Sequence, residues 1–154
     1  MHILIDVQGY QSESKVRGIG RSTLAMSRAI IENAGEHRVS ILINGMYPID
    51  NINDVKMAYR DLLTDEDMFI FSAVAPTAYR HIENHGRSKA AQAARDIAIA
   101  NIAPDIVYVI SFFEGHSDSY TVSIPADNVP WKTVCVCHDL IPLLNKERYL
   151  GDPN

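Results

Sequence analysis

Residues 133–143 read Thr-Val-Cys-Val-Cys-His-Asp-Leu-Ile-Pro-Leu. The first five residues form an apolar run, rich in β-branched side chains, of the kind typical of a buried strand. The strand leads directly into an imidazole, His138, and a carboxylate, Asp139. Because open α/β sheets bind ligands outside the carboxyl ends of their strands, this stretch indicates both the fold class and the edge where function should lie.

Four further runs of the same kind lie upstream, at residues 3–7, 39–43, 68–73 and 106–110. Most of them have no polar face, which suits strands that helices cover on both sides. The 154 residues are 47% hydrophobic, enough for one α/β domain with a real core. We therefore predict a single α/β domain built on a Rossmann-like, doubly wound parallel sheet.

Three helices are expected between these strands. The first begins near residues 18–20 and ends before Gly35, and the second has Asn53 as its N-cap. The third spans residues 88–103 and stops at Pro104. Its inward positions are predicted to be Ala91, Ala94, Ala98 and Ile102. Residues 114–131 show no sustained period, so they are expected to form a loop or a short irregular strand.

Charge and hydropathy exclude several classes of partner. The chain carries 14 Lys and Arg residues against 19 Asp and Glu residues, a net charge of −5, so no nucleic-acid partner is expected. The apolar run near the amino terminus is too short for the core of a signal peptide or for a membrane span. We therefore expect a cytoplasmic location.

The cysteines and histidines give no metal-binding pattern. Cys135 and Cys137 lie two apart in the last predicted strand, so we interpret both as small core residues on one face. Neither the C-x-x-C redox spacing nor a zinc set is present, and the histidines have no metal-ligand spacing. No metal and no cofactor are expected.

The segment after the first strand is the first candidate site. Gln8 and Gly9 follow that strand directly, and Gly18 and Gly20, with Arg21 beside them, open the first helix. Glycines let a backbone approach a ligand, and the free N–H groups of a helix start suit a phosphate. The stretch is neither a Walker A motif nor the full dinucleotide fingerprint. The alternative is that both glycines serve only a tight turn and close packing.

The segments after the fourth and fifth strands supply three more candidates. Glu114 is placed to accept a hydrogen bond from a hydroxyl or to act as a base, although an acidic loop residue is most often solvated. His138 and Asp139 are placed to bind sugar hydroxyls or to support acid–base chemistry. The alternative reading makes His138 a hydrogen-bonded structural residue and Asp139 a cap of the turn into Pro142.

Taken together, these segments resemble the amino-terminal domain of GT-B glycosyltransferases of family 4, the retaining "group 1" class that includes mannosyltransferases of bacterial polysaccharide assembly. The resemblance rests on four stretches in the family's order and spacing. They are residues 3–9, 17–21, 104–115, and 138–144 followed by 148–150.

The resemblance implies transfer of a sugar, with mannose favoured, from a nucleotide sugar such as a GDP donor to a growing polysaccharide or lipid-linked saccharide. It implies retention of the anomeric configuration and no metal requirement. Gly18, Gly20 and Arg21 would approach the donor diphosphate. His138 and Asp139 would lie at the transferred sugar, and Glu114, Gln8 and Gly9 would line the acceptor side. A peripheral contact with the inner face of a membrane stays open.

The sequence departs from the family in one respect. The family's carboxyl-terminal donor-binding domain, with its Glu-x7-Glu motif, is absent from these residues. We therefore expect residues 1–154 to be a truncated acceptor-side domain that is inactive alone. Two alternatives remain. One is a stand-alone flavodoxin-like module that binds a nucleotide or an anion without catalysis, and the other is an interaction surface formed by Phe112, Phe113 and Trp131.

Overall fold

The computed structural model describes residues 1–112, 114–124, 129–138 and 144. Five parallel strands form one sheet in the order β3-β2-β1-β4-β5. The strands are β1 (His2–Asp6), β2 (Arg38–Asn44), β3 (Met68–Phe71), β4 (Ile106–Val109) and β5 (Lys132–Cys135). All five predicted strands are confirmed, and so is the Rossmann-like fold class. The strand order reverses between β1 and β4, which makes their carboxyl ends the topological switch point.

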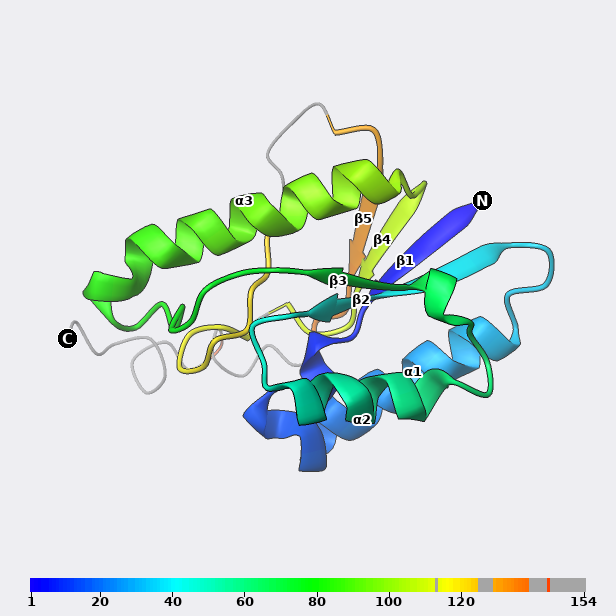
Figure 1. Ribbon diagram of the computed structural model, residues 1–154, viewed down its shortest axis with the longest axis horizontal. Coiled ribbons are helices and arrows are strands. Elements are labelled where there is room, and N and C mark those ends of the chain that lie inside the picture. The colour runs from blue at the N-terminus through cyan, green and yellow to red at the C-terminus, as the bar shows by residue number, and fades with distance from the viewer. Residues whose placement is uncertain (113, 125–128, 139–143, 145–154) are drawn as a thin grey trace.

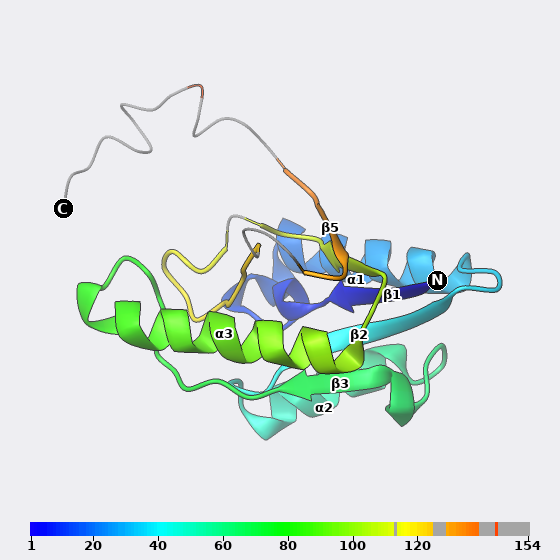
Figure 2. The same ribbon diagram turned by 90° about the horizontal axis from the view of Figure 1, so that it is seen from above.

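The helices form a layer on each face of the sheet (Figures 1 and 2). α1 (Gly18–Glu32) and α2 (Ile49–Tyr59) lie on one face, over a cluster that includes Ile5 and Ile41. α3 (His85–Ile102) lies on the other face, over a cluster that includes Leu4. Because successive side chains of a strand point to opposite faces, β1 feeds both cores. No helix in the described part of the chain is long and apolar enough to cross a membrane.

Short 3-10 turns connect several of these elements. Two follow β1, η1 (Gln8–Tyr10) and η2 (Glu13–Val16), and lead into α1. The others are η3 (Asp65–Asp67) before β3 and η4 (Ile82–Asn84) before α3.

The helix boundaries confirm one prediction and correct another. α1 begins at Gly18, as predicted. The prediction of Asn53 as the N-cap of the second helix was wrong, because α2 already begins at Ile49, directly after Pro48. Pro48 is the N-cap, with a φ of −54° and a ψ of 151°, and it lacks the N–H that a helix start leaves unpaired, so it suits a helix that begins at Ile49. α3 ends at Ile102, and its C-cap Ala103, which directly precedes Pro104, has a left-handed φ of 51°.

The edge strand β5 differs from its predicted environment. Its residues form a strand, but Val134 is 44% exposed, and Cys135 and Cys137 are exposed as well. The prediction of two core cysteines was therefore wrong. β5 pairs only with β4 and carries no neighbour on its outer side within the described residues, so an apolar sequence alone did not ensure burial. Trp131, by contrast, is buried under α3, which removes it from the apolar surface patch considered above.

A buried ion pair joins α3 to the central strand. The guanidinium of Arg95 donates to the Asp6 carboxylate from Nη2 at 2.8 Å and from Nε at 3.0 Å. Both side chains have 0% exposure. The inward face of α3 is therefore Ser88, Ala91, Arg95 and Ile99, with Ala94, Ala98 and Ile102 only partly buried. Two buried charges persist in a core only when they are paired and hydrogen-bonded, as they are here.

Replacing Arg95 with Met should lower the free energy of unfolding by about 3–5 kcal/mol, because it leaves the Asp6 carboxylate buried without its cation. The matched control is Arg38→Met, which removes the ion pair between Arg38 and Asp67, where the arginine side chain is 54% exposed. That control should cost less than about 1 kcal/mol. Urea unfolding followed by circular dichroism measures both. Equal losses in the two variants would contradict this role for Arg95.

Candidate functional site

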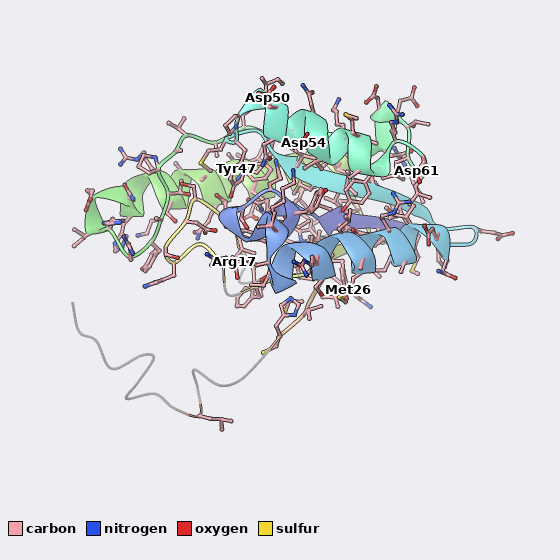
Figure 3. The ribbon with its side chains drawn as sticks, turned by 90° about the horizontal axis from the view of Figure 1, so that it is seen from below. Arg17, Met26, Tyr47, Asp50, Asp54 and Asp61 are labelled. Carbon is pink, nitrogen blue, oxygen red and sulfur yellow. The ribbon has the colours of Figure 1, made fainter. Side chains whose placement is uncertain are left out.

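Every strand contributes a segment to the carboxyl edge of the sheet. η1, η2 and the start of α1 follow β1, residues 45–48 follow β2, and residues 72–81 follow β3. Residues 110–124 follow β4, and residues 136–138 follow β5. Figure 3 shows the consequence, with Arg17 and Tyr47 at the starts of α1 and α2 toward one end of the molecule and Asp61 toward the other. The segments singled out in the sequence therefore share one edge.

Gln8 ties three of these segments together. Its Nε2 donates to the carbonyl of Thr121 at 2.7 Å and to the Asp6 carboxylate at 3.0 Å. Its Oε1 accepts hydrogen bonds from Asn44 Nδ2 at 2.7 Å and from the Thr121 N–H at 3.0 Å. Gln8 is fully buried, so the structure gives it the role of holding the edge together. Its predicted contact with substrate stays a prediction.

The same buried layer continues through Gln11 toward α2. The Gln11 side chain accepts from the Asn44 N–H at 2.8 Å and donates to the Asn44 carbonyl at 3.0 Å. Asn51, in α2, donates to the Gln11 carbonyl at 2.8 Å. On the far side, Arg95 donates to the carbonyl and hydroxyl of Ser123. The carboxyl edge thus rests on a layer of buried polar groups whose hydrogen bonds are largely satisfied within the protein.

The three glycines have different surroundings. A Cβ added to Gly9 would collide with Oγ1 of the buried Thr23, and one added to Gly20 would collide with the backbone of Lys15. Gly18, at the start of α1, has nothing within 4 Å of an added Cβ. Gly9 and Gly20 are therefore needed for close packing. Gly18 is the glycine whose open side faces away from the protein, and Arg21 is exposed one turn further on.

Two other predicted residues lie in the segments that follow the neighbouring strands β4 and β5. Glu114 is half-buried and accepts a hydrogen bond from Ser111 Oγ at 3.4 Å, whereas His138 is exposed beyond the end of β5. Burial, followed by the nearby charge of Asp118, raises the pKa of Glu114, and the charge of His138 acts in the opposite direction. Glu114 and His138 therefore lie within electrostatic range of each other at the ends of adjacent strands. Asp139 lies outside the described residues.

Two hydrogen-bonded segments divide the edge beside Glu114. The Tyr79 N–H donates to the Gly115 carbonyl and the Arg80 N–H to the His116 carbonyl, both at 2.9 Å. Gly115 has a φ of 92°, a conformation that suits glycine and lets the chain turn away from Glu114. The paired segments leave a hollow on each side.

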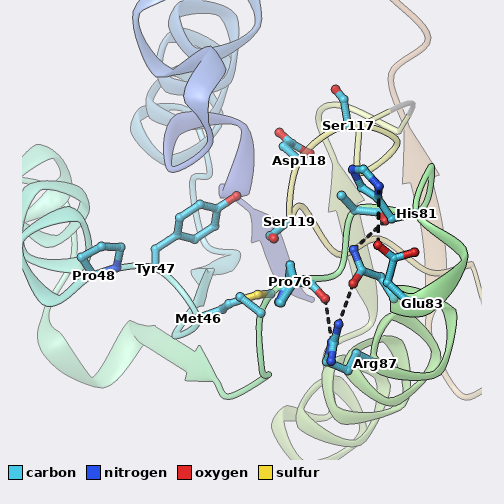
Figure 4. Close-up of a pocket in the computed structure, with 13 residues that line it drawn as sticks. Met46, Tyr47, Pro48, Pro76, His81, Glu83, Arg87, Ser117, Asp118 and Ser119 are labelled. Carbon is cyan, nitrogen blue, oxygen red and sulfur yellow. Dashed lines mark hydrogen bonds and ion pairs between the residues drawn. The ribbon is translucent and has the colours of Figure 1, made fainter.

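The larger hollow, called the cleft below, has a volume of about 580 Å³ (Figure 4). Its walls come from the segments after β2, β3 and β4, from η4 and from the first turn of α3, and they include Tyr47, Pro76, Glu83, Arg87, Asp118 and Ser119. The smaller hollow, of about 210 Å³, lies on the α3 side and contains Glu114 and Tyr120. Among the residues described in the structure, no group of three His, Cys, Asp or Glu side chains is placed to hold a metal ion.

Tyr120 was missed in the sequence because an aromatic residue in an irregular loop carries no periodic signal. It is buried, and within the described structure its hydroxyl has no hydrogen-bond partner. Burial raises the pKa of Tyr120 well above its usual value, so its hydroxyl stays protonated. Arg95 was also missed, although it lies four residues from both Ala91 and Ile99 on one helical face. That helical spacing places Arg95 on the same face as two apolar residues, and it was the signal in the sequence that could have identified Arg95 as buried.

Two curated proteins of Escherichia coli are nearly identical to this chain over the segments that match it. The chain is 99% identical over all 154 residues to a "Serotype-specific mannosyltransferase WbdA" of Escherichia coli, of which it covers 18%. A second E. coli protein of the same description is 95% identical over 129 residues, which are 84% of this chain and 16% of that protein. The chain thus spans less than a fifth of these curated relatives. No protein-family model matches it, and no solved structure matches it.

The two glycines of α1 should respond differently to the same substitution. Gly20→Ala should lower the free energy of unfolding by about 1–3 kcal/mol, because its Cβ would displace the backbone of Lys15. Gly18→Ala should leave it unchanged or raise it by up to about 1 kcal/mol, because alanine favours the helix and meets nothing. Urea unfolding of both variants checks this. A destabilised Gly18→Ala would mean that Gly18 also serves packing.

Proposed function

We propose that residues 1–154 form the acceptor-side part of a retaining mannosyltransferase with the GT-B, family 4 architecture. The complete protein would move mannose from a nucleotide sugar to a growing saccharide. The 99% identity with a protein described as a mannosyltransferase, over the whole length of this chain, carries the proposal. The doubly wound fold and the convergence of Gly18, Glu114 and His138 at its carboxyl edge support it.

The donor diphosphate would meet the start of α1. The first N–H groups of a helix have no partner within the helix, and the helix dipole favours negative charge there. The open side of Gly18 would allow a phosphate to approach, while the exposed Arg17 and Arg21 would add positive charge. Gly20 would contribute by fixing the helix start against Lys15, and its direct contact with the diphosphate stays a prediction.

The bonds that break and form in mannosyl transfer determine which chemical groups the site would need. Transfer breaks the bond between the sugar's anomeric carbon and the donor phosphate oxygen, and it forms a bond from that carbon to an acceptor hydroxyl oxygen. The nucleoside diphosphate leaves with the bonding electrons, and its phosphate oxygen takes up the proton that the acceptor hydroxyl loses. Groups that stabilise charge on the leaving diphosphate therefore speed the reaction.

Glu114 and His138 would act on the side of the sugars. A carboxyl group with a raised pKa takes up a proton more readily than an ordinary one, so Glu114 would suit a hydrogen bond from a sugar hydroxyl. His138, exposed beyond the end of β5, would contact the transferred sugar, with Asp139 following in the chain. We extend the proposal to a cytoplasmic location with a peripheral contact at the inner face of the membrane, as the family resemblance implies.

His138→Ala should lower kcat for mannosyl transfer by about 100-fold, the usual cost of losing one positioned donor at a reacting group. The assay uses the full-length E. coli relative carrying these 154 residues, a GDP-mannose donor and mannoside acceptors, and it quantifies the saccharide product. The free energy of unfolding should change by less than about 1 kcal/mol, since the side chain is exposed.

The matched control for this substitution is His37→Ala, an exposed histidine in the turn before β2, at the opposite edge of the sheet. It should transfer mannose at the wild-type rate. Near-wild-type turnover in a folded His138→Ala variant would remove His138 from the site. Absence of transfer by the unsubstituted protein with any mannoside would overturn the proposed function.

A further inference from the structure

The strand β3 forms an unpaired edge of the sheet. It pairs with β2, and no strand in the described part of the chain lies on its other side. The Phe71 carbonyl accepts a hydrogen bond from the Gly45 N–H at 2.8 Å, so it points toward the β2 side. Because alternate residues of a strand direct their N–H and C=O groups to opposite sides, those of Ile70 and Ser72 point outward. This edge therefore offers backbone donors and acceptors to another strand.

This edge lacks the charges that usually protect an exposed strand from pairing. Residues 68–79 contain no charged side chain. Two apolar side chains of this segment, Ile70 and Val74, are 46% and 72% exposed. Natural edge strands are commonly blunted by a lysine, a proline or an inward-pointing charge, and β3 contains none of these. An apolar edge that is exposed without such protection is typical of an interface.

An apolar groove widens this surface on the side of α3. It has a volume of about 240 Å³ and lies between α3 and the segment that follows β3, which run side by side in Figures 1 and 2. Val74 forms part of one wall, and Ala90 and Ala94 of α3 form part of the other. Ile97, which is 62% exposed, lies about one turn further along the same side of the helix. The groove shares only Arg87 with the cleft, so the two are different surfaces.

The two ends of this edge carry opposite charges. Asp65 and Glu66 precede β3, and both are exposed. Arg87 borders the groove at the carboxyl end of β3, and among the described residues its guanidinium donates only to neutral groups. An antiparallel partner that carries the same charges places its basic end beside the acidic end of β3, and its acidic end beside the basic one. A second copy of this chain meets both conditions.

We propose that β3 pairs with the β3 of a second copy of the protein, antiparallel and around a two-fold axis. With the axis at Phe71, the N–H and C=O groups of Ile70 in each copy meet those of Ser72 in the other. The two sheets then become one continuous sheet, and the carboxyl edges of the two copies point in opposite directions. The interface therefore leaves the candidate site of each copy open, and it does not depend on the proposed function.

The test measures the mass of the full-length E. coli relative carrying these 154 residues, by sedimentation equilibrium over a range of protein concentrations. The unsubstituted protein should form dimers. Ile70→Lys should raise the dissociation constant of the dimer by about 100-fold, because the two-fold axis brings two ammonium groups together in an apolar surface. Val74→Lys should raise it by about tenfold, because its ammonium group loses water when the interface closes. Since Val74 is 72% exposed, the second variant should fold normally.

Val16→Lys is the matched control for Val74→Lys. Val16 is 73% exposed, and it lies in η2, which follows the central strand β1 rather than the edge strand β3. The substitution adds the same charge to an equally exposed valine, so it should leave the dissociation constant of the dimer unchanged. Circular dichroism of the three variants checks that each keeps its secondary structure. Equal weakening of the dimer by Val16→Lys and Val74→Lys would attribute the effect to net charge and overturn the inference.

Amide hydrogen exchange in the same protein identifies what covers the edge. The amides of Ile70 and Ser72 should be protected in the dimer and should exchange faster in Val74→Lys. A monomeric unsubstituted protein would overturn the inference, and protection of these two amides in that monomer would assign the edge to another segment of the longer chain. A dimer that persists unaltered in both Ile70→Lys and Val74→Lys would also overturn it, because its interface would lie elsewhere.

Discussion

The fully buried ion pair between Asp6 and Arg95 is the constraint on which the carboxyl edge depends. It fixes α3 against the central strand, and it orients the Asp6 carboxylate so that the Gln8 amide can reach it. Gln8 in turn holds the backbone of Thr121. A chain of hydrogen bonds therefore runs from a helix, through the sheet, to the segment that carries Glu114. Such a layer is costly to leave half-satisfied, which favours one arrangement of the edge.

This organisation separates residues buried within the carboxyl edge from residues exposed at its surface. Gln8 and Gly20 were expected at substrate from their positions, yet one is buried in the polar layer and the other packs on Lys15. Gly18, Glu114 and His138 keep exposed or half-exposed surfaces at the same edge. A parallel sheet makes this division possible, because its rigid strands end together while the following loops stay free to differ in sequence.

The sequence was sufficient for the parts of the fold that depend on local periodicity. Apolar runs predicted all five strands, and the alternation of strands and helices predicted the doubly wound class. Burial of β5 could not be predicted, because whether an apolar strand is covered depends on its neighbours in space. The pairing of Arg95 was missed for the same reason, because its partner Asp6 lies 89 residues away and helical spacing places Arg95 on the inward face without identifying a partner. Tyr120 was missed because it lies in an irregular loop that carries no periodic signal.

Amide hydrogen exchange in Arg95→Lys tests whether the buried polar layer holds the segment after β4 in place. Lysine keeps the charge but loses the planar fork that grips Asp6 and Ser123. We predict faster exchange at Thr121 and across the paired segments around Tyr79, with the amides of β1 and β2 still protected. Unchanged exchange at Thr121, or a uniform increase over the whole chain, would show that the polar layer does not hold this segment.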